Sequence, residues 1–274
     1  DFMRPDRVVI GCENERAKNI LKELYRPLYL LETPILFTQR ETAELIKYAA
    51  NSFLATKISF INEISDLCEK VGANISDVST GIGLDGRIGK KFLHPSPGYG
   101  GSCFPKDTLA LVKTAQDFKS PLGLVEQVVK SNLNRKKNMH KRILQPLKKI
   151  NKKKKLAILG LTFKPNTDDM RDSPSLDIIP NLIKNNCNLN LFDPEGMDEA
   201  KKLFKKFSKN INWSNDSYDA CIGADALVIL TEWNQFRALD MKKIKKLLKS
   251  PNIIDLRNIY NGRELRDFGF NYYS

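Results

Sequence analysis

The stretch Lys155-Leu-Ala-Ile-Leu-Gly160 decides the fold of this chain, because it is a short apolar run that ends in glycine and opens an alternation of strand-like and helix-like segments. Helical spacing fills most of the gaps between the later strand candidates, which lie at 189–192, 211–213, 226–230 and 253–255. Such alternation predicts a parallel sheet with crossover helices, whose ligands bind at the carboxyl ends of the strands. Lys164 follows the first of these strands, and Arg257 follows the last.

A helix-start signal, Ser173-Pro174, follows this first strand. Serine is a favoured N-cap and proline a favoured first helical residue, so we expect the first crossover helix to begin here, with free N–H groups able to seat a phosphate. The usual G-x-G-x-x-G motif is absent. The pattern therefore indicates a nucleotide-like domain, and a fold alone does not give a function.

The middle of the chain has helical spacing apart from one glycine-rich loop. Helices are expected at 41–70, about 104–117 and about 121–148. Gly72-Ala-Asn-Ile-Ser-Asp77 breaks the first of these and restarts a helix, with Asn74 or Ser76 as its cap. This part is therefore predicted to be all-helical.

The first forty residues predict a small αβ fragment. Strand, helix and strand are expected at 7–11, 14–24 and 34–38. A fragment of this size cannot bury a core of its own. It reads as the last part of a larger sheet.

Composition excludes several classes of protein. The 274 residues are 28% charged and 41% hydrophobic, no apolar run approaches the length of a membrane span, and residues 1–7 lack the apolar core of a signal peptide. The five cysteines form no C-x-x-C pair, and the two histidines match no metal-ligand spacing. We expect a cytoplasmic protein without a disulfide framework, a metal site or a membrane segment.

The net charge of +13 permits a nucleic-acid interpretation. Much of the excess lies in two lysine-rich runs, 148–155 and 242–249. The second has helical spacing that turns its lysines to solvent. No zinc finger, aromatic RNA-binding motif or basic heptad array accompanies the charge. We therefore expect no nucleic-acid partner, and a basic surface that attracts phosphate-bearing substrates instead.

The glycine-rich loop contains the strongest chemical signal. Residues 81–102 hold seven of the fifteen glycines, and 98–108 read Gly-Tyr-Gly-Gly-Ser-Cys-Phe-Pro-Lys-Asp-Thr. Cys103 is predicted at a helix N-terminus, where free N–H groups and the helix dipole favour a thiolate. The alternative is a buried structural cysteine beside a loop, which is the commoner situation.

Three further residues suit the chemistry of such a thiol. Lys47 and Asn51 lie four residues apart, so they share a helix face and are able to hold an oxyanion or a water; the ordinary alternative is a solvated face. Asp107 lies four residues after Cys103, where a carboxylate also suits the helix dipole and needs no other role.

Three long stretches resemble the UDP-glucose 6-dehydrogenases of the UDP-glucose/GDP-mannose dehydrogenase family. Phe92-Leu-His-Pro-Ser-Pro-Gly-Tyr-Gly-Gly-Ser-Cys-Phe-Pro-Lys-Asp107 resembles the nucleophile segment. The stretch Glu44–Glu63 resembles the central helix, and Gly160–Pro174 resembles the start of the C-terminal domain. The resemblance is collinear over nearly the whole chain.

The resemblance implies a role for each matching residue. Cys103 would be the nucleophile, Lys47 and Asn51 would stabilise oxyanions, and Asp107 would serve the hydrolytic water. NAD contacts are implied for Lys106 and Arg171. Substrate contacts are implied for Lys47, Arg87 (reaching the partner subunit's substrate), Phe92, Leu93, His94, Pro95, Ser96, Gly100, Lys164 and Arg257. His94 stands where some members have lysine, which puts that contact in doubt.

The implied activity is the two-step, NAD-dependent oxidation of UDP-glucose to UDP-glucuronate through a thiohemiacetal and a thioester on Cys103, in a homodimer. The implied parts are a remnant of the NAD-binding domain (1–40), a central helical dimerisation domain (41–148) and a Rossmann-like UDP-sugar domain (149–274). Because the family's main NAD-binding domain would precede Arg7, we expect this chain alone to be inactive. Two alternatives remain, a GDP-mannose or other nucleotide-sugar dehydrogenase, and a non-catalytic nucleotide-sugar-binding remnant.

Overall fold

The computed structural model describes residues 4–31 and 33–274, so the first three residues of the segment inspected for a signal peptide lie outside it. The chain divides into two compact units, Asp1–Phe53 and Leu54–Ser274, which are described separately below.

The first unit is a strand–helix–strand fragment, as predicted. It contains β1 (Val8–Gly11), α1 (Glu15–Leu24), a 3-10 helix (Arg26–Leu31), β2 (Ile35–Thr38) and the start of α2 (Arg40–Val71). The two strands pair in parallel. Among the described residues of this unit, the only buried apolar side chains are Ile10 and Leu28. This agrees with the prediction that the fragment has little core of its own.

The helical part of the second unit follows the predicted breaks. Helix α2 ends at Val71, because Gly72 adopts a positive φ of 75°. Asn74 is the cap of α3 (Ile75–Gly83), since its side chain accepts the Ser76 N–H at 2.9 Å. Helices α4 (Phe104–Asp117) and α5 (Gly123–Leu144) follow, and a 3-10 turn (Gln145–Leu147) completes the predicted last helix. The predicted ranges 41–70, 104–117 and 121–148 therefore agree with the observed helices within two residues at each end.

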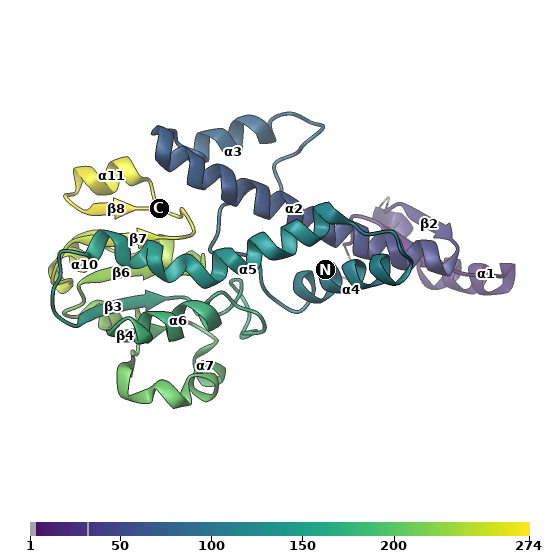
Figure 1. The fold of residues 1–274 in the computed structure, drawn as a ribbon. Coiled ribbons are helices and arrows are strands. Elements are labelled where there is room, and N and C mark those ends of the chain that lie inside the picture. Colours follow the sequence, from purple (N-terminus) through teal and green to yellow (C-terminus); the bar gives the residue numbers. More distant parts are fainter. Residues whose placement is uncertain (1–3, 32) are drawn as a thin grey trace. The chain divides into compact units, whose positions relative to one another are not determined.

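The C-terminal part of this unit is a six-stranded parallel sheet with the order β5-β4-β3-β6-β7-β8 (Figure 1). Its strands are β3 (Lys154–Leu159), β4 (Cys187–Phe192), β5 (Ile211–Trp213), β6 (Ala226–Ile229), β7 (Asn252–Asp255) and β8 (Asn271–Tyr273). The connecting helices are α6 (Ser175–Lys184), α7 (Met197–Leu203), α8 (Ser217–Cys221), α9 (Asn234–Arg237), α10 (Met241–Leu247) and α11 (Gly262–Asp267), with a 3-10 helix at Lys205–Asn210.

The two faces of this sheet have separate apolar cores. Along β3, Leu156 and Ile158 pack in one core, whereas Ala157 and Leu159 pack in the other. A parallel strand covered on both faces reads as a continuous apolar run, which explains the Leu-Ala-Ile-Leu sequence. The strand order reverses between β3 and β6, and a crevice beyond the carboxyl ends of the strands at such a point is the usual ligand site.

One prediction for this part is corrected by the structure, and one strand was not predicted. Helix α6 begins at Ser175, with Pro174 as its N-cap residue, which is one position later than predicted. The Ser173 hydroxyl donates to the Leu161 carbonyl at 2.7 Å and its oxygen accepts the Ser175 N–H at 3.3 Å. Strand β8 was not predicted, since Asn-Tyr-Tyr at a sheet edge has no run of apolar residues.

The lysines of α10 are exposed around the buried Ile244, as expected. No helix in the described ranges has the length and apolar character of a membrane span.

Candidate functional site

Cys103 lies at the N-cap position of α4 and is exposed. The alternative of a buried structural cysteine is therefore wrong. Cys68, Cys187 and Cys221 are buried instead, and burial raises the pKa of Cys187 to about 11 and that of Cys221 to about 12. The fold thus leaves Cys103 as the exposed thiol and keeps two others protonated near neutral pH.

Asp107 follows Cys103 by one helical turn, and its N–H donates to the Cys103 carbonyl at 2.9 Å. The carboxylate side chain is 1% exposed and forms an ion pair with the Lys106 ammonium. A buried carboxylate needs such a partner, because an unpaired charge is costly away from water. The first turn of α4 thus holds a thiol, a cation and a carboxylate together.

The glycine turn before Cys103 packs directly on the loop that follows β3. A Cβ on Gly100 would lie 2.3 Å from the Asp172 carbonyl oxygen, and one on Gly101 would lie 2.6 Å from the Phe163 ring. The Gly101 N–H donates to the Arg171 carbonyl at 2.8 Å. Gly100 is required because a backbone carbonyl lies too close for a side chain, and Gly101 because the Phe163 ring fills the space and its φ is 84°.

Arg171 lies within electrostatic range of Cys103. Its pKa is raised chiefly by the hydrogen bond to Asp169, and the charge of Cys103 contributes in the same direction. Two residues far apart in the sequence are therefore neighbours in the fold.

The loop from Phe92 to Ser96 divides into buried and accessible positions. Leu93 is 2% exposed and packs in an apolar cluster with Ile61, while Pro95 and Ser96 are also buried. Phe92 has a positive φ of 64° and its ring meets that of Phe104 edge to face. His94 is exposed. Among these five residues, a ligand would find the His94 side chain most accessible.

Helix α5 holds this loop and the glycine turn with side chains that the sequence analysis did not single out. The Asn132 amide accepts the Tyr99 N–H at 2.8 Å and donates to the Tyr99 carbonyl at 3.1 Å. Arg135 donates to the Ser96 carbonyl at 2.7 Å. Their spacing along the helix was visible, but an inward polar face has the same pattern as a solvated one.

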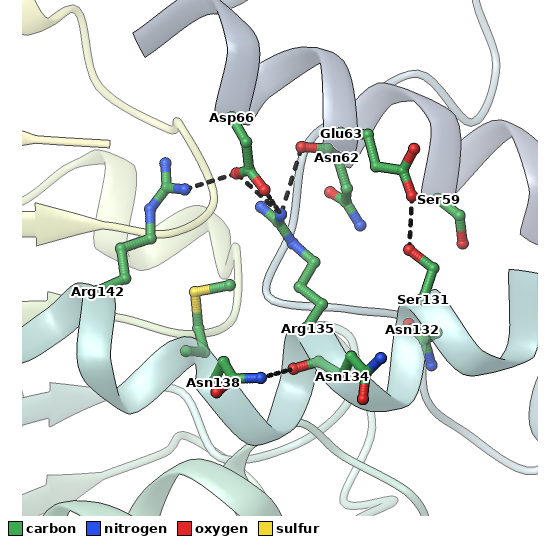
Figure 2. Close-up of a pocket in the computed structure, with 11 residues that line it drawn as sticks. Ser59, Asn62, Glu63, Asp66, Ser131, Asn132, Asn134, Arg135, Asn138 and Arg142 are labelled. Carbon is green, nitrogen blue, oxygen red and sulfur yellow. Dashed lines mark hydrogen bonds and ion pairs between the residues drawn. The ribbon is translucent and has the colours of Figure 1, made fainter. Parts of the chain in front are cut away.

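Arg135 also lines a polar cavity of about 400 Å³ between α2 and α5 (Figure 2). Its guanidinium and that of Arg142 both bind Asp66, at 2.9 and 2.7 Å. The Ser131 hydroxyl donates to Glu63 at 2.6 Å. These side chains bind one another across the two helices, which indicates a structural role for the network.

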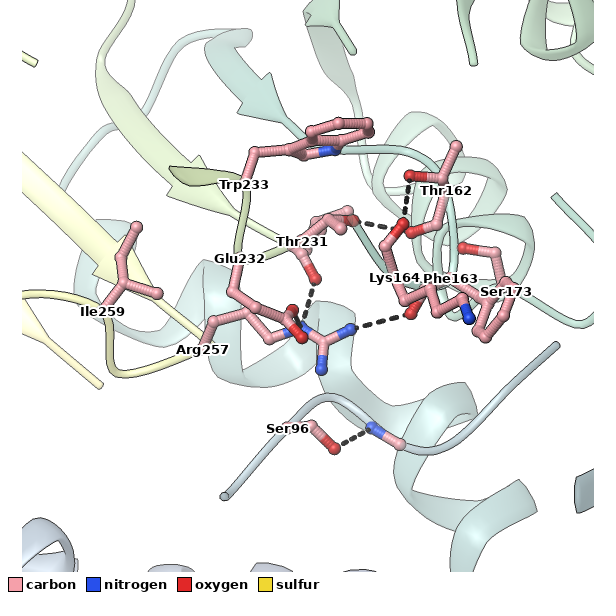
Figure 3. A network of polar contacts seen from close by, with 12 residues as sticks. Ser96, Thr162, Phe163, Lys164, Ser173, Thr231, Glu232, Trp233, Arg257 and Ile259 are labelled. Atoms are coloured by element: carbon pink, nitrogen blue, oxygen red, sulfur yellow. Dashed lines mark hydrogen bonds and ion pairs between the residues drawn. The ribbon is translucent and has the colours of Figure 1, made fainter. Parts of the chain in front are cut away.

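Arg257 joins the carboxyl ends of three strands (Figure 3). It donates to the Leu230 carbonyl at 2.7 Å and to the Phe163 carbonyl at 3.2 Å, and its Nε lies 3.0 Å from the Glu232 carboxylate. Lys164 is exposed, with its ammonium 5.4 Å from the centre of the Phe163 ring. Phe163 therefore links both predicted substrate cations to the turn of Cys103.

Each of the three arginines singled out in the sequence follows an aspartate by two residues. Arg87 and Arg171 bind this aspartate through both backbone N–H and guanidinium, and each guanidinium lowers the pKa of its aspartate. Arg257 donates only its backbone N–H to Asp255. The Asp-x-Arg spacing was a sequence signal that these cations are held in a fixed geometry.

Lys47 and Asn51 lie on the portion of α2 that belongs to the first unit, whereas Cys103 and Asp107 lie in the second. Lys47 is exposed and Asn51 is half-buried. Arg87 is exposed in the loop after α3. The geometry described above therefore concerns the thiol, its carboxylate neighbour and the cations of the second unit.

The six-stranded sheet does not fit a dinucleotide in the usual manner. In dinucleotide-binding sheets, an acidic residue after the second strand accepts a hydrogen bond from a ribose hydroxyl, and Asp193, at the end of β4, has that position here. It is fully buried and accepts N–H bonds from Leu161 at 2.6 Å and Gly196 at 2.8 Å. Its carboxylate is thus occupied by the protein itself. The residues that the structure describes also contain no cluster of side chains suited to a metal.

Comparisons with known proteins find one family along most of the chain. The central-domain model of the UDP-glucose/GDP-mannose dehydrogenase family matches residues 41–134, and the family's UDP-binding domain matches residues 157–262. The UDP-glucose 6-dehydrogenase of Rhizobium meliloti is 56% identical over the whole chain and that of Rickettsia typhi 47%. The chain spans 62% and 63% of these two relatives.

A solved structure of a UDP-glucose dehydrogenase from Pyrobaculum islandicum has the same fold. It superimposes with a TM-score of 0.87 at 30% identity, covering the whole of this chain and 59% of that protein.

Proposed function

Because the chain belongs to the UDP-glucose/GDP-mannose dehydrogenase family, we propose that it carries the thiol half of a UDP-glucose 6-dehydrogenase, which oxidises UDP-glucose to UDP-glucuronate with NAD. The observation that carries the proposal is the exposed Cys103 at a helix N-terminus. The turn before Cys103 is hydrogen-bonded, from the Gly101 N–H to the Arg171 carbonyl, to the loop that contains Lys164 and Arg171. A nucleophile and cations suited to phosphates then lie on two segments that are hydrogen-bonded to each other.

Four residues of the chain have defined chemical tasks in this proposal. The Cys103 thiolate attacks the C6 aldehyde, forming a C–S bond and placing negative charge on the aldehyde oxygen. Lys47 and Asn51 stabilise that oxyanion. After the second oxidation, Asp107 orients the water that hydrolyses the thioester and releases the carboxylate product.

NAD accepts the two hydrides when it is bound. Lys106, which follows Cys103 in the first turn of α4, and Arg171 are exposed cations, and their chemistry fits the phosphates of a dinucleotide. The buried Asp193 supports a division of labour in which the six-stranded sheet binds UDP and another part of the enzyme supplies the main NAD site. We therefore expect the chain alone to be inactive.

The three-part division at residues 40 and 148 belongs to the same proposal. The two family matches, 41–134 and 157–262, fall on either side of the second boundary.

A homodimer through the helical part is supported by exposed apolar residues on α2, where Phe60 is 52%, Leu67 56% and Val71 67% exposed. Sedimentation of a Phe60→Asp, Leu67→Asp variant as a monomer, against a dimeric parent, would support it.

Steady-state assays test the activity. The chain alone, and the chain joined to a dinucleotide-binding domain from the Rhizobium meliloti relative, are mixed with UDP-glucose and NAD. Only the joined protein should form NADH, and Cys103→Ser should abolish UDP-glucuronate formation. Robust turnover by the chain alone would contradict the expected inactivity, and full activity of the serine variant would refute the role of Cys103.

Titration calorimetry tests the alternatives. UDP should bind the chain more tightly than GDP, since residues 157–262 match a UDP-binding domain. A preference for GDP would favour a GDP-mannose enzyme. UDP binding together with equal alkylation rates of all five cysteines would favour a non-catalytic binding remnant.

A further inference from the structure

Lys136 is a buried cation at the junction of the Cys103 turn and the sheet. It lies on α5, and its side chain is only 4% exposed. The ammonium lies 3.7 Å from the Asp172 carboxylate, 3.6 Å from the Asp177 carboxylate and 3.4 Å from the Asp172 carbonyl oxygen. A lysine is rarely buried to this degree unless it is paired.

The methylene groups of the Lys136 side chain also pack against the glycine turn. A Cβ on Gly98 would lie 2.7 Å from the Lys136 Cγ and 3.0 Å from the Asn132 side-chain oxygen. The apolar stem thus packs against the turn, while the ammonium continues to the two aspartates. One side chain therefore contacts both partners of the junction.

The residue that the ammonium holds is itself part of the junction. Asp172 has a positive φ of 51°, and its carbonyl lies against Gly100. The backbone carbonyl of its neighbour Arg171 accepts the Gly101 N–H. A left-handed conformation at a non-glycine residue persists only when its surroundings hold it in place. Lys136 supplies a charge that holds this peptide and the first turn of α6, where Asp177 lies.

We propose that Lys136 is a positioning residue, which fixes the Gly98–Gly101 turn against the Asp172 peptide and so keeps the Cys103 thiol in register with the loop of Lys164 and Arg171. It touches neither substrate nor cofactor in this proposal. Displacement of a reacting group by about 1 Å is able to cost about 100-fold in rate. The effect on turnover rests on the proposed function, whereas the effect on the geometry of the turn does not.

Lys136→Met tests the proposal, because methionine keeps the apolar stem and removes the charge. The variant should fold, since Asp172 and Asp177 are 56% and 41% exposed and water can solvate them. Lys137→Met is the matched control, because Lys137 is the next residue of the same helix and is exposed. Lys136→Arg should restore the cation.

Hydrogen exchange of the Gly101 amide in the chain is the first measurement. Lys136→Met should accelerate it at least about tenfold, while an amide of strand β3 such as that of Ile158 stays within about twofold. The control should match the parent. Unchanged exchange at Gly101 would overturn the proposal. If Lys136→Met does not fold, Asp177→Asn takes its place and should accelerate the same amide.

Kinetics of the chain joined to the dinucleotide-binding domain of the Rhizobium meliloti relative are the second measurement. Lys136→Met should lower kcat at least about tenfold and change KM for UDP-glucose less than about threefold, and Lys136→Arg should recover most of kcat. Equal losses in the Lys137→Met control would refute the positioning role. An inactive parent would refute the proposed function instead and leave the exchange result to decide the role of Lys136.

Discussion

Gly100→Ala should break the contact between the Cys103 turn and the sheet. The new Cβ would lie 2.3 Å from the Asp172 carbonyl oxygen and 2.9 Å from its carbon, both of which are backbone atoms that cannot rotate away. Overpacking of this kind costs about 1–3 kcal/mol. The required shift also removes the Gly101–Arg171 hydrogen bond, which contributes about 1 kcal/mol more.

The total of about 2–4 kcal/mol is a large fraction of the stability of an ordinary domain. Urea unfolding of the variant and the parent chain measures it. Gly81→Ala is the matched control, because Gly81 lies in α3, has nothing within 4 Å of its Cβ position and gains helix propensity, which should stabilise the chain by about 0.5–1 kcal/mol. A Gly100→Ala variant as stable as the parent would refute the close packing of these two backbones.

Three further predictions concern the cysteine thiols and Arg257 of the second unit. Iodoacetamide at pH 7.5 should modify Cys103 at least about tenfold faster than Cys187 or Cys221, and mass mapping that finds equal labelling would contradict the exposure argument. Burial raises the thiol pKa values of Cys187 and Cys221 above their ordinary range, so the folded state favours the protonated thiols. The stability that this contributes is complete below about pH 8.5 and is lost as the pH rises towards 11–12. Between pH 9 and 11, the free energy of unfolding of Cys187→Ala should therefore fall less than that of the parent chain. Arg257→Met should weaken UDP binding at least about tenfold and destabilise the chain by about 1–3 kcal/mol, since it leaves the Glu232 carboxylate unpaired; calorimetry showing unchanged affinity would remove Arg257 from the substrate site.

The sequence by itself predicted most of the helices and strands and the helix-terminal position of Cys103. Short apolar runs predicted five of the six sheet strands, and Pro105 after a glycine turn predicted the start of α4. These features depend on local propensity, capping and periodicity, which act within a few residues. The polar edge strand β8 was missed because it has no such local signal.

Only the tertiary structure decided which polar residues face inward. Lys136 and Lys137 are adjacent lysines in one helix, yet one is buried against two aspartates and the other is exposed. The contact between Gly100 and Asp172 likewise joins positions 72 residues apart, and Asp193 is occupied by the backbone N–H groups of another loop. Such pairings depend on how the strands and helices pack, because the energy of a buried charge is set by the groups around it and not by its neighbours in sequence.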